Sequence, residues 1–415
     1  MDGLTGRLMK NYERDERGMH AGFFRQSVAF HIQNDYIDKC QPIDIKGEYV
    51  VEGQRNTDSA LIYDAKDKKT GERFCFKVLK PLDGVRNTKR KKDQGDNEDE
   101  KERLKCLIRG LDANRMHAPG VVLGISCLKE HIEGKSFFCE KFYRELKLED
   151  VKRELREVLA YGKQYALVMR YLADECRLEV LLESGSLDSQ TAMNMLAQQV
   201  ADKHKLLKEA PLNKRDEFIF LSKKLRDNGD LLNKIDCIRV KDESIKNVIR
   251  KLEICLKAKK EIFKERRDNK CIKRCHGDLK PGNLWLSPAL PLQSAKLLAL
   301  DCIDFNRPDF YYIDTLCDVA MLAITLEHSF TLRLGKEKAR GLVEVFLDDY
   351  LEYMEEEKEK VLFLLDYYMA EKAIVCAYTS YNDGQTFYVV EQYLELASMH
   401  AERLTEYLPV FAQIR

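Results

Sequence analysis

The chain has 415 residues, and its 70 basic side chains are balanced by 70 acidic ones, which gives a formal net charge of zero. A chain of this length is expected to form about two or three domains with a large buried core. The charge balance argues against a general nucleic-acid binder, which normally shows a basic excess. The hydrophobic content of 44% argues against global disorder.

The N-terminal residues and the cysteines bear on the cellular compartment. The first 17 residues are charged throughout and contain no apolar stretch typical of a secretory signal peptide. We find no apolar run of transmembrane length and expect no membrane span. Cys271, Cys275 and His276 stand close together, but no further ligands follow at zinc-like spacing. We therefore expect the 13 cysteines to be free thiols in a reducing, cytoplasmic environment.

The first half of the chain has the pattern of a β-rich unit. Residues 1–45 form an extension whose role the sequence does not indicate. Alternating apolar stretches over 48–52, 60–63 and 74–79, with a hairpin turn at Lys69-Thr70-Gly71, predict an antiparallel meander. Its third strand contains Lys77. Further elements are expected in chain order: a charged loop and exposed helix over 86–105, a helix around 104–111, strands at 121–128 and 137–142, a helix at 148–159, and a strand at 165–169.

After Met169 the pattern becomes helical. Helices are predicted over 186–208 and within 213–268, and four more follow Asp314. A β-rich part followed by a larger helical part predicts an α+β protein with two lobes and a cleft between them. We assign 46–167 to the N-lobe and 168–415 to the C-lobe.

The most informative segment begins at His276. Its His276, Asp278 and Asn283 match the kinase catalytic-loop pattern H-R-D-L-x-x-x-N, with Gly277 in place of the arginine. In that pattern the aspartate orients the acceptor hydroxyl and takes its proton, while the asparagine holds Mg²⁺. The bend at Pro281-Gly282 allows the loop to fold back into the same cleft. We predict Asp278 as catalytic and Asn283 as a metal ligand. His276, grouped with the catalytic residues, is expected to hold the loop backbone.

Four other charged residues complete this constellation. An apolar stretch over 295–300 leads into Asp301 and Asp304, where a second acidic Mg²⁺ ligand is required. We favour Asp301 because it directly follows the apolar stretch, and we retain Asp304 as a second ligand or a support. Lys77 occupies a strand upstream, as a phosphate-binding lysine does. Lys280 is placed to reach the γ-phosphate and to offset developing negative charge.

On these motifs the chain resembles the aminoglycoside phosphotransferase and choline-kinase-like family, and it looks closest to an uncharacterised bacterial subgroup. That family is a branch of the protein-kinase-like fold and carries H-G-D in place of H-R-D. The matching segments fall within residues 45–400 and comprise 76–81, 114–119, 167–170, the H-G-D loop, 300–306, Asp314 and Asp318. The resemblance implies a protein-kinase-like bilobal fold, a cleft for ATP and Mg²⁺, and an adenine-binding hinge at Met169, Arg170 and Tyr171.

The chain departs from the family pattern in its phosphate loop and in its helix glutamate. Residues 53–59 replace a glycine-rich loop, and Thr57 or Ser59 would donate hydrogen bonds to phosphate instead. Gly110 stands near the position expected for the glutamate that pairs with the phosphate-binding lysine. The candidates to substitute for that glutamate are Glu98, Glu100 and Glu102. Glycine in the H-G-D motif also excludes the arginine that pairs with an activation-loop phosphate, so control by that route is not expected.

We therefore expect a kinase that depends on ATP and Mg²⁺ and phosphorylates a hydroxyl of a small molecule. The alternatives are a Ser/Thr protein kinase with a protein acceptor, and a catalytically weak nucleotide-binding pseudokinase. Neither nucleic acid nor membrane is expected as a partner. Acceptor pockets vary within one fold, so the sequence does not identify the acceptor. Asp314 and Asp318 are expected to brace the catalytic loop, and His204 is expected to be a core or loop-bracing histidine.

Overall fold

The computed structural model describes residues 45–57, 60–80, 92–132, 136–145, 164–211, 216–233, 235, 243–287, 295–303 and 310–408. Nearly all of the predicted N-terminal extension and the predicted helix at 148–159 lie outside this part. The predicted site residues Ser59 and Asp304 also lie outside it. Their structure is not described, and these predictions remain predictions.

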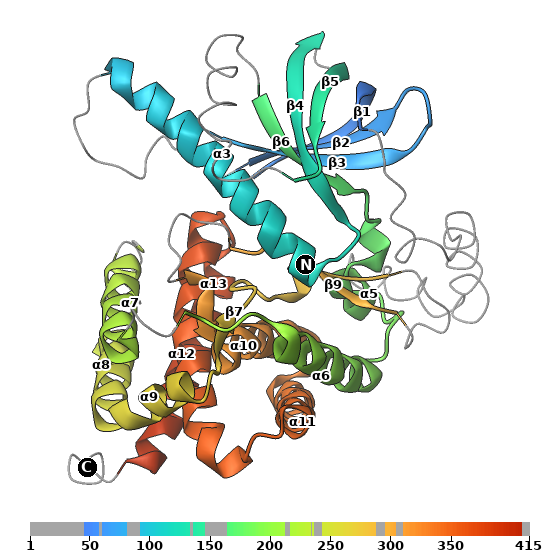
Figure 1. Cartoon of the computed structure of the whole chain (residues 1–415). Helices are drawn as coiled ribbons and strands as arrows, with labels where there is room; N and C mark the ends of the chain where they lie inside the picture. Colours follow the sequence, from blue (N-terminus) through green and yellow to red (C-terminus); the bar gives the residue numbers. More distant parts are fainter. Residues whose placement is uncertain are drawn as a thin grey trace, which may run out of the picture.

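A six-stranded antiparallel sheet forms the N-terminal part of the molecule and lies at the top of Figure 1. Its order is β1-β2-β3-β6-β4-β5, and β1 also pairs with β5, so the sheet closes into a barrel. The predicted meander is confirmed, and Lys77 lies on its third strand. The strands are β1 (Gly47–Asn56), β2 (Ala60–Asp67), β3 (Arg73–Leu79), β4 (Val122–Ile132), β5 (Ser136–Tyr143) and β6 (Gln164–Arg170).

Aromatic side chains fill the interior of the barrel. Tyr49 stacks on Phe137 with ring centroids 5.6 Å apart, and Phe76 meets both rings edge-on at 4.9 and 4.8 Å. The Tyr49 hydroxyl donates to the carbonyl of Ile45 at 3.0 Å, which satisfies its polar group inside the core. Because Phe76 precedes Lys77 on β3, this packing fixes the strand while Lys77 points to the opposite side.

Helix α3 (Lys92–His117) packs against the sheet and extends towards the helical part (Figure 1). The apolar residues predicted for this helix, Leu104, Leu107, Ile108 and Leu111, are all buried and pack with side chains of β4 and β6. The same cluster includes Leu298 and Leu300 from the C-terminal part of the chain. The helix therefore joins the sheet to the segment that leads into Asp301.

The rest of the described chain is mainly helical. The four helices predicted after Asp314 are confirmed. Two short antiparallel strand pairs, β7 with β10 and β8 with β9, carry the predicted catalytic segment between α9 and α10. The elements are α5 (Leu178–Glu183), α6 (Ser189–Leu206), α7 (Glu217–Leu232), α8 (Glu243–Ala258), α9 (Lys260–Asp268), β7 (Ile272–Arg274), β8 (Leu284–Leu286), β9 (Leu297–Ala299), β10 (Tyr312–Asp314), α10 (Thr315–Leu334), α11 (Lys336–Met354), α12 (Lys358–Asn382) and α13 (Phe387–Arg403).

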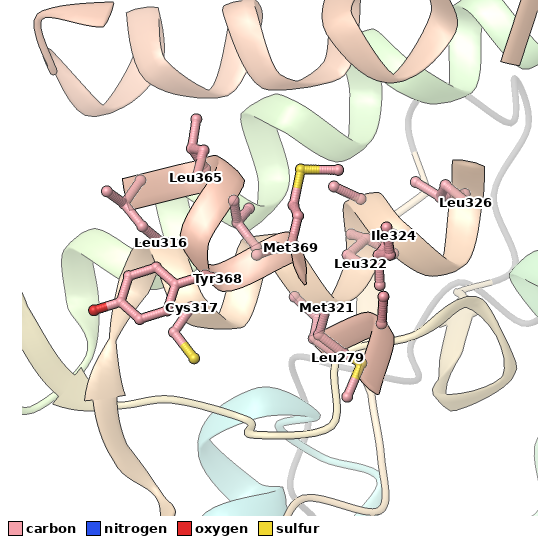
Figure 2. Packing of buried hydrophobic residues seen from close by; sticks show 14 of the residues in the cluster. Leu279, Leu316, Cys317, Met321, Leu322, Ile324, Leu326, Leu365, Tyr368 and Met369 are labelled. Atoms are coloured by element: carbon pink, nitrogen blue, oxygen red, sulfur yellow. The ribbon is translucent and has the colours of Figure 1, made fainter. Parts of the chain in front are cut away.

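Helix α10 is the central helix of this part. Every side chain from Thr315 to His328 is buried. Figure 2 shows Met321 of α10 beside Leu279 of the catalytic segment, with Tyr368 and Met369 of α12 nearby. The prediction that no stretch has transmembrane character was wrong by length and composition, because α10 is long and apolar enough to cross a membrane. However, 83% of its apolar window is buried inside the protein, as in the core helix of a globular domain.

A buried charge cluster ties α10, α12 and α13 together. His400 is 1% exposed, and its ring nitrogens lie 2.7 Å from Asp366 and 3.4 Å from Glu327. Burial alone would lower the pKa of His400, but its hydrogen bonds to these two carboxylates raise it overall. The folded protein therefore favours the charged imidazolium.

This cluster predicts a pH-dependent contribution to stability. Because the folded-state pKa of His400 is raised, its stabilisation is complete below the unfolded value of about 6.5 and is lost as the pH rises through the folded-state value. His400→Gln should cost about 3 kcal/mol in the free energy of unfolding near pH 6 and clearly less near pH 9, measured by urea denaturation. His328→Gln is the control, because burial lowers the pKa of His328. A loss that does not depend on pH for His400→Gln would contradict the assignment.

Candidate active site

The segment that begins at His276 is held by the first turn of α10. The buried Asp318 carboxylate accepts the N–H of His276 at 3.0 Å and the N–H of Gly277 at 2.8 Å, and it lies 3.3 Å from Nε2 of His204. Burial would raise the pKa of Asp318, but the hydrogen bond from His204 and the neighbouring imidazoles of His204, His276 and His117 lower the pKa well below its usual range. The expected loop-bracing role of Asp318 and His204 is confirmed by these contacts.

A second brace is formed by Asp314, which caps α10. Its carboxylate accepts the N–H of Leu316 at 2.9 Å. Arg266 of α9 binds the same carboxylate with two parallel hydrogen bonds of 2.9 and 2.8 Å. Asp314 thus fixes the start of α10 and brings Asp318, one turn later, under the loop.

His276 is fully buried, and the two hydrogen bonds of its ring are both to backbone groups. Its Nδ1 accepts the N–H of Asp278 at 3.3 Å, so its Nε2 carries the proton and donates to the carbonyl of Leu300 at 2.9 Å. The ring thereby links the loop to the residue just before Asp301. This geometry suits a positioning residue, as the sequence indicated.

Gly277 has a conformation that favours glycine. Its φ is +85°, and a Cβ atom at this position would lie 2.8 Å from Cδ1 of Ile303. The neighbouring backbone is fixed as well, because the N–H of Ile303 donates to the carbonyl of His276 at 3.0 Å. A larger side chain would both strain the backbone and displace Ile303. Glycine in the H-G-D motif thus has a steric reason in this structure.

Asp278, Lys280 and Asn283 meet at one carboxylate oxygen. The Lys280 ammonium lies 2.9 Å from Oδ2 of Asp278, and the amide nitrogen of Asn283 donates to the same oxygen at 3.0 Å. Burial tends to lower the pKa of Lys280, but the Asp278 carboxylate beside it raises the pKa overall. The Asp278 side chain is 29% exposed and reaches the surface of the site.

Asp301 and Asn283 are brought together by the β8–β9 pair. Asn283 comes directly before β8, and its carbonyl accepts the N–H of Leu300 at 3.0 Å. Asp301 follows with φ of +63°, and its carboxylate forms an ion pair with Lys77 of β3. Lys77 holds the pKa of Asp301 below its usual value. Four predicted residues, including Asp278, therefore lie in one site.

The acidic residue paired with Lys77 comes from the C-terminal part of the chain. Within the described residues, Lys77 forms an ion pair with Asp301. Of the three helix glutamates considered, Glu102 is buried and forms an ion pair with Lys105, three residues further along α3. The side chains of Glu98 and Glu100 lie outside the described set.

The predicted nucleotide-binding residues lie at two other places. The Thr57 hydroxyl donates to the carbonyl of Ala60 at 3.0 Å, so this side chain closes the turn between β1 and β2. Met169 and Arg170 end β6, and Tyr171 follows. The backbone N–H of Arg170 donates to Val121 at 2.9 Å. The N–H of Tyr171 donates to the carbonyl of Arg73 at 3.3 Å. Since both N–H groups are engaged, an adenine bound here would have to contact backbone carbonyls or side-chain surfaces. The hinge assignment stays a prediction.

Two residues near the end of α3 were not assigned roles from the sequence. The buried Asn114 donates to the carbonyl of Gly110 at 2.7 Å, and its oxygen accepts the N–H of Cys302 at 3.3 Å. His117 packs edge-on against His276 with ring centroids 5.4 Å apart. Both tie α3 to the catalytic segment. Residues 114–119 were among the segments that carry the family resemblance, but neither the burial of Asn114 nor its partner 188 residues away could be read from the sequence.

One cysteine belongs to a cluster of side chains that lie close enough together to bind a metal ion. All eleven described cysteines are free. Cys275, His204 and Asp318 place one ligand atom each within 4.8 Å of one another. Each already has a protein partner: the Cys275 thiol contacts the carbonyl of Ile313 at 3.5 Å, and Nδ1 of His204 lies 2.7 Å from the Tyr350 hydroxyl. The third member, Asp318, already accepts the N–H groups of His276 and Gly277.

Comparison with known proteins gives structural similarities only. No family model and no curated protein matches the chain. A glucosamine kinase in complex with glucosamine, ADP and inorganic phosphate is 12% identical, with 92% of this chain and 99% of that chain covered and a TM-score of 0.39. A choline kinase from Cryptosporidium parvum is 11% identical, with coverage of 94% and 97% and a TM-score of 0.48.

An aminoglycoside phosphotransferase from Alicyclobacillus acidocaldarius is similar at 12% identity, with coverage of 90% and 97% and a TM-score of 0.41. These structures are small-molecule kinases or phosphotransferases, the group that the sequence motifs resemble. At such low identities and TM-scores, the functional assignment depends on the contacts within the site itself.

The conformation of Gly277 predicts a graded pair of substitutions. Gly335→Ala introduces a Cβ at φ +86° and ψ 159° with nothing within 4 Å, so it should cost only the backbone strain of about 1–3 kcal/mol. Gly277→Ala adds the clash with Ile303 and should cost about 1–3 kcal/mol more. Chemical denaturation measures both, and Ile303→Ala should restore part of the loss in Gly277→Ala. Equal losses for the two glycines would contradict the steric role of Ile303.

Proposed function

We propose that the chain is a phosphotransferase that uses ATP and Mg²⁺ to phosphorylate a hydroxyl of a small molecule, on a protein-kinase-like bilobal fold. The observation that carries the proposal is the convergence of Asp278, Asn283, Asp301 and Lys77 in one site. These residues come from β3, the catalytic segment and the end of β9. Together they supply a hydroxyl-orienting carboxylate, two Mg²⁺ ligand types and a phosphate-binding cation.

Asp278 has the geometry of the residue that orients the acceptor. Its Oδ2 is held by Asn283 and Lys280, and its Oδ1 makes no hydrogen bond within the described residues. One oxygen is therefore fixed while the other can accept the proton of an acceptor hydroxyl. The N–H of Gly277 donates to Asp318 and the N–H of Asp278 donates to His276, so the carboxylate has a fixed direction.

The oxygens available at Asn283 and Asp301 fit a magnesium ion. The amide nitrogen of Asn283 donates to Asp278, which leaves its carbonyl oxygen for a cation. Asp301 adds a carboxylate that is 60% exposed. Carboxylate and carbonyl oxygens with room for water are the ligands that Mg²⁺ prefers. A bound Mg²⁺ would neutralise phosphate charge, and Asp304 could supply a further oxygen.

Two lysines are placed to hold phosphate. Lys77 reaches the site from β3, and its ion pair with Asp301 supports a role in holding a phosphate beside the metal. Lys280 lies beside Asp278, where the γ-phosphate must approach the acceptor. We retain Ser59 and the segment Met169 to Tyr171 as nucleotide contacts, and the domains 46–167 and 168–415, as parts of this proposal.

The first test is chemical. Asp278→Asn should lower phosphoryl transfer by roughly 10²–10⁴-fold and leave nucleotide binding unchanged, because the amide cannot take the hydroxyl proton. Labelled ATP with a metabolite extract, read by mass spectrometry, measures transfer, and fluorescence of a bound ATP analogue measures binding. Lys360→Met, on an exposed residue of α12, is the control. Undiminished transfer by Asp278→Asn would refute the proposal. In a parallel incubation with a cell lysate, label in proteins instead of metabolites would favour the protein-kinase alternative.

The second test distinguishes the two candidate metal aspartates. Asp301→Asn should raise the Mg²⁺ concentration for half-maximal transfer by at least about tenfold, because it replaces an anionic ligand with a neutral one. Asp304→Asn should have a smaller effect if Asp304 only supports the site. A Mg²⁺ titration of each variant at saturating ATP measures this. A larger effect at Asp304 would exchange the two roles.

A further inference from the structure

Asp301 has a backbone conformation that its neighbours must hold. Its φ is +63°, in the left-handed region that few residues other than glycine adopt. The two other described non-glycine residues with positive φ, Lys270 and Glu355, follow the C-terminal ends of α9 and α11, where this conformation commonly closes a helix. Asp301 instead comes after strand β9. A left-handed residue in such a place persists only where surrounding contacts fix it, and such residues cluster at functional sites.

The two peptide groups that flank Asp301 are held by two different side chains. In the peptide group before it, the carbonyl of Leu300 accepts a hydrogen bond from Nε2 of His276 at 2.9 Å. In the peptide group after it, the N–H of Cys302 donates to the side-chain oxygen of Asn114 at 3.3 Å. Because the orientations of two planar peptide groups set φ and ψ of the residue between them, His276 and Asn114 together fix the conformation of Asp301.

The amide of Asn114 is oriented for this role. Asn114 is 4% exposed, and its Nδ2 donates to the carbonyl of Gly110, one turn earlier in α3, at 2.7 Å. Since the nitrogen of an amide carries the donors and the oxygen accepts, this hydrogen bond turns the oxygen towards Cys302. The role requires a donor and an acceptor at the end of one short side chain, which an apolar residue of the same size lacks.

The end of α3 that carries Asn114 is itself anchored. Lys203 of α6 donates to the carbonyl of His117, the last residue of α3, at 2.9 Å. This bond also connects α3 to the helical part, but it ends on the helix backbone and not on a peptide group beside Asp301. Lys203 and Asn114 therefore allow two effects to be separated experimentally, the anchoring of α3 and the holding of Asp301.

We propose that Asn114 is a positioning residue for the metal site: from α3 it holds Asp301 in the left-handed conformation that directs the carboxylate into the site. This proposal rests on the proposed phosphotransferase function, in which Asp301 is a Mg²⁺ ligand, and extends the metal site to α3. Asn114 does not itself bind the metal and acts on Asp301 only through the backbone of Cys302. Its loss should therefore weaken metal binding and loosen the backbone beside Asp301.

The first test follows amide hydrogen exchange in the full-length, ligand-free protein, read at the Cys302 amide by mass spectrometry of overlapping fragments. Asn114→Leu removes the acceptor at similar size, so exchange there should become about tenfold faster, the change expected from one buried hydrogen bond. Asn114→Asp retains an oxygen that can accept the N–H of Cys302 and should recover part of the protection. Lys203→Met is the matched control and should leave exchange within about twofold of the unaltered protein. Unchanged exchange in Asn114→Leu would overturn the proposal.

The second test measures the metal site without an acceptor. Mn²⁺ replaces Mg²⁺ as a paramagnetic probe in the presence of ADP, and water-proton relaxation distinguishes Mn²⁺ on the protein from Mn²⁺ on free nucleotide. Asn114→Leu should raise the Kd of Mn²⁺ at least about tenfold, as the loss of a residue that orients a metal ligand does, whereas Lys203→Met should stay within about twofold. Thermal unfolding checks that each variant is folded. Asn114→Ala has the same expected results and replaces Asn114→Leu if that variant does not fold.

The outcomes separate this proposal from the phosphotransferase assignment. If the unaltered protein binds neither ADP nor Mn²⁺, both fail. If the unaltered protein binds both and Asn114→Leu binds Mn²⁺ equally tightly, only the role of Asn114 fails. Equal losses of Mn²⁺ affinity in Asn114→Leu and Lys203→Met would show that both residues merely anchor α3, and would also overturn the proposal.

Discussion

The carboxylate of Asp318 accepts two consecutive backbone N–H groups, those of His276 and Gly277, from inside the first turn of α10. An anion at this end of a helix is favoured by the helix dipole, and in a buried site such hydrogen bonds are strong. The orientation of Asp278 follows from them, because the two preceding peptide groups cannot rotate. The apolar packing of α10 against α12 holds the carboxylate itself in place. The hydrophobic core around α10 thus sets the direction of the partly exposed Asp278 side chain.

The site also depends on contacts between distant segments. The side-chain oxygen of Asn114, at the end of α3, accepts a hydrogen bond from the N–H of Cys302. Lys77 of β3 forms an ion pair with Asp301. Both contacts join the N-terminal sheet and its helix to the segment after β9. The aromatic core of the barrel keeps β3 rigid, so Lys77 is presented from a fixed strand. The charged side chains of the site are therefore each held by a rigid element.

Much of this arrangement could be predicted from local patterns. Alternation and turn residues predict the meander with Lys77, and the spacing from His276 to Asn283 follows from the chemistry of one loop. The motifs placed Lys77 and Asp301 in one site, but the direct ion pair between these residues, 224 positions apart, could not be predicted. The composition of α10 alone cannot distinguish a membrane span from a core helix, because only burial separates them.

The ion pair between Lys77 and Asp301 has a thermodynamic consequence. Each member is needed by a different ligand under the proposed function, Lys77 by the nucleotide phosphates and Asp301 by the metal. Either ligand must first separate the two charges, and the second then binds without that cost. Nucleotide and metal should therefore bind with positive, reciprocal coupling: each increases the affinity of the other by the same factor. In the ligand-free protein the charges of Lys77 and Asp301 neutralise each other. Binding of metal and nucleotide together is therefore favoured over binding of either one alone.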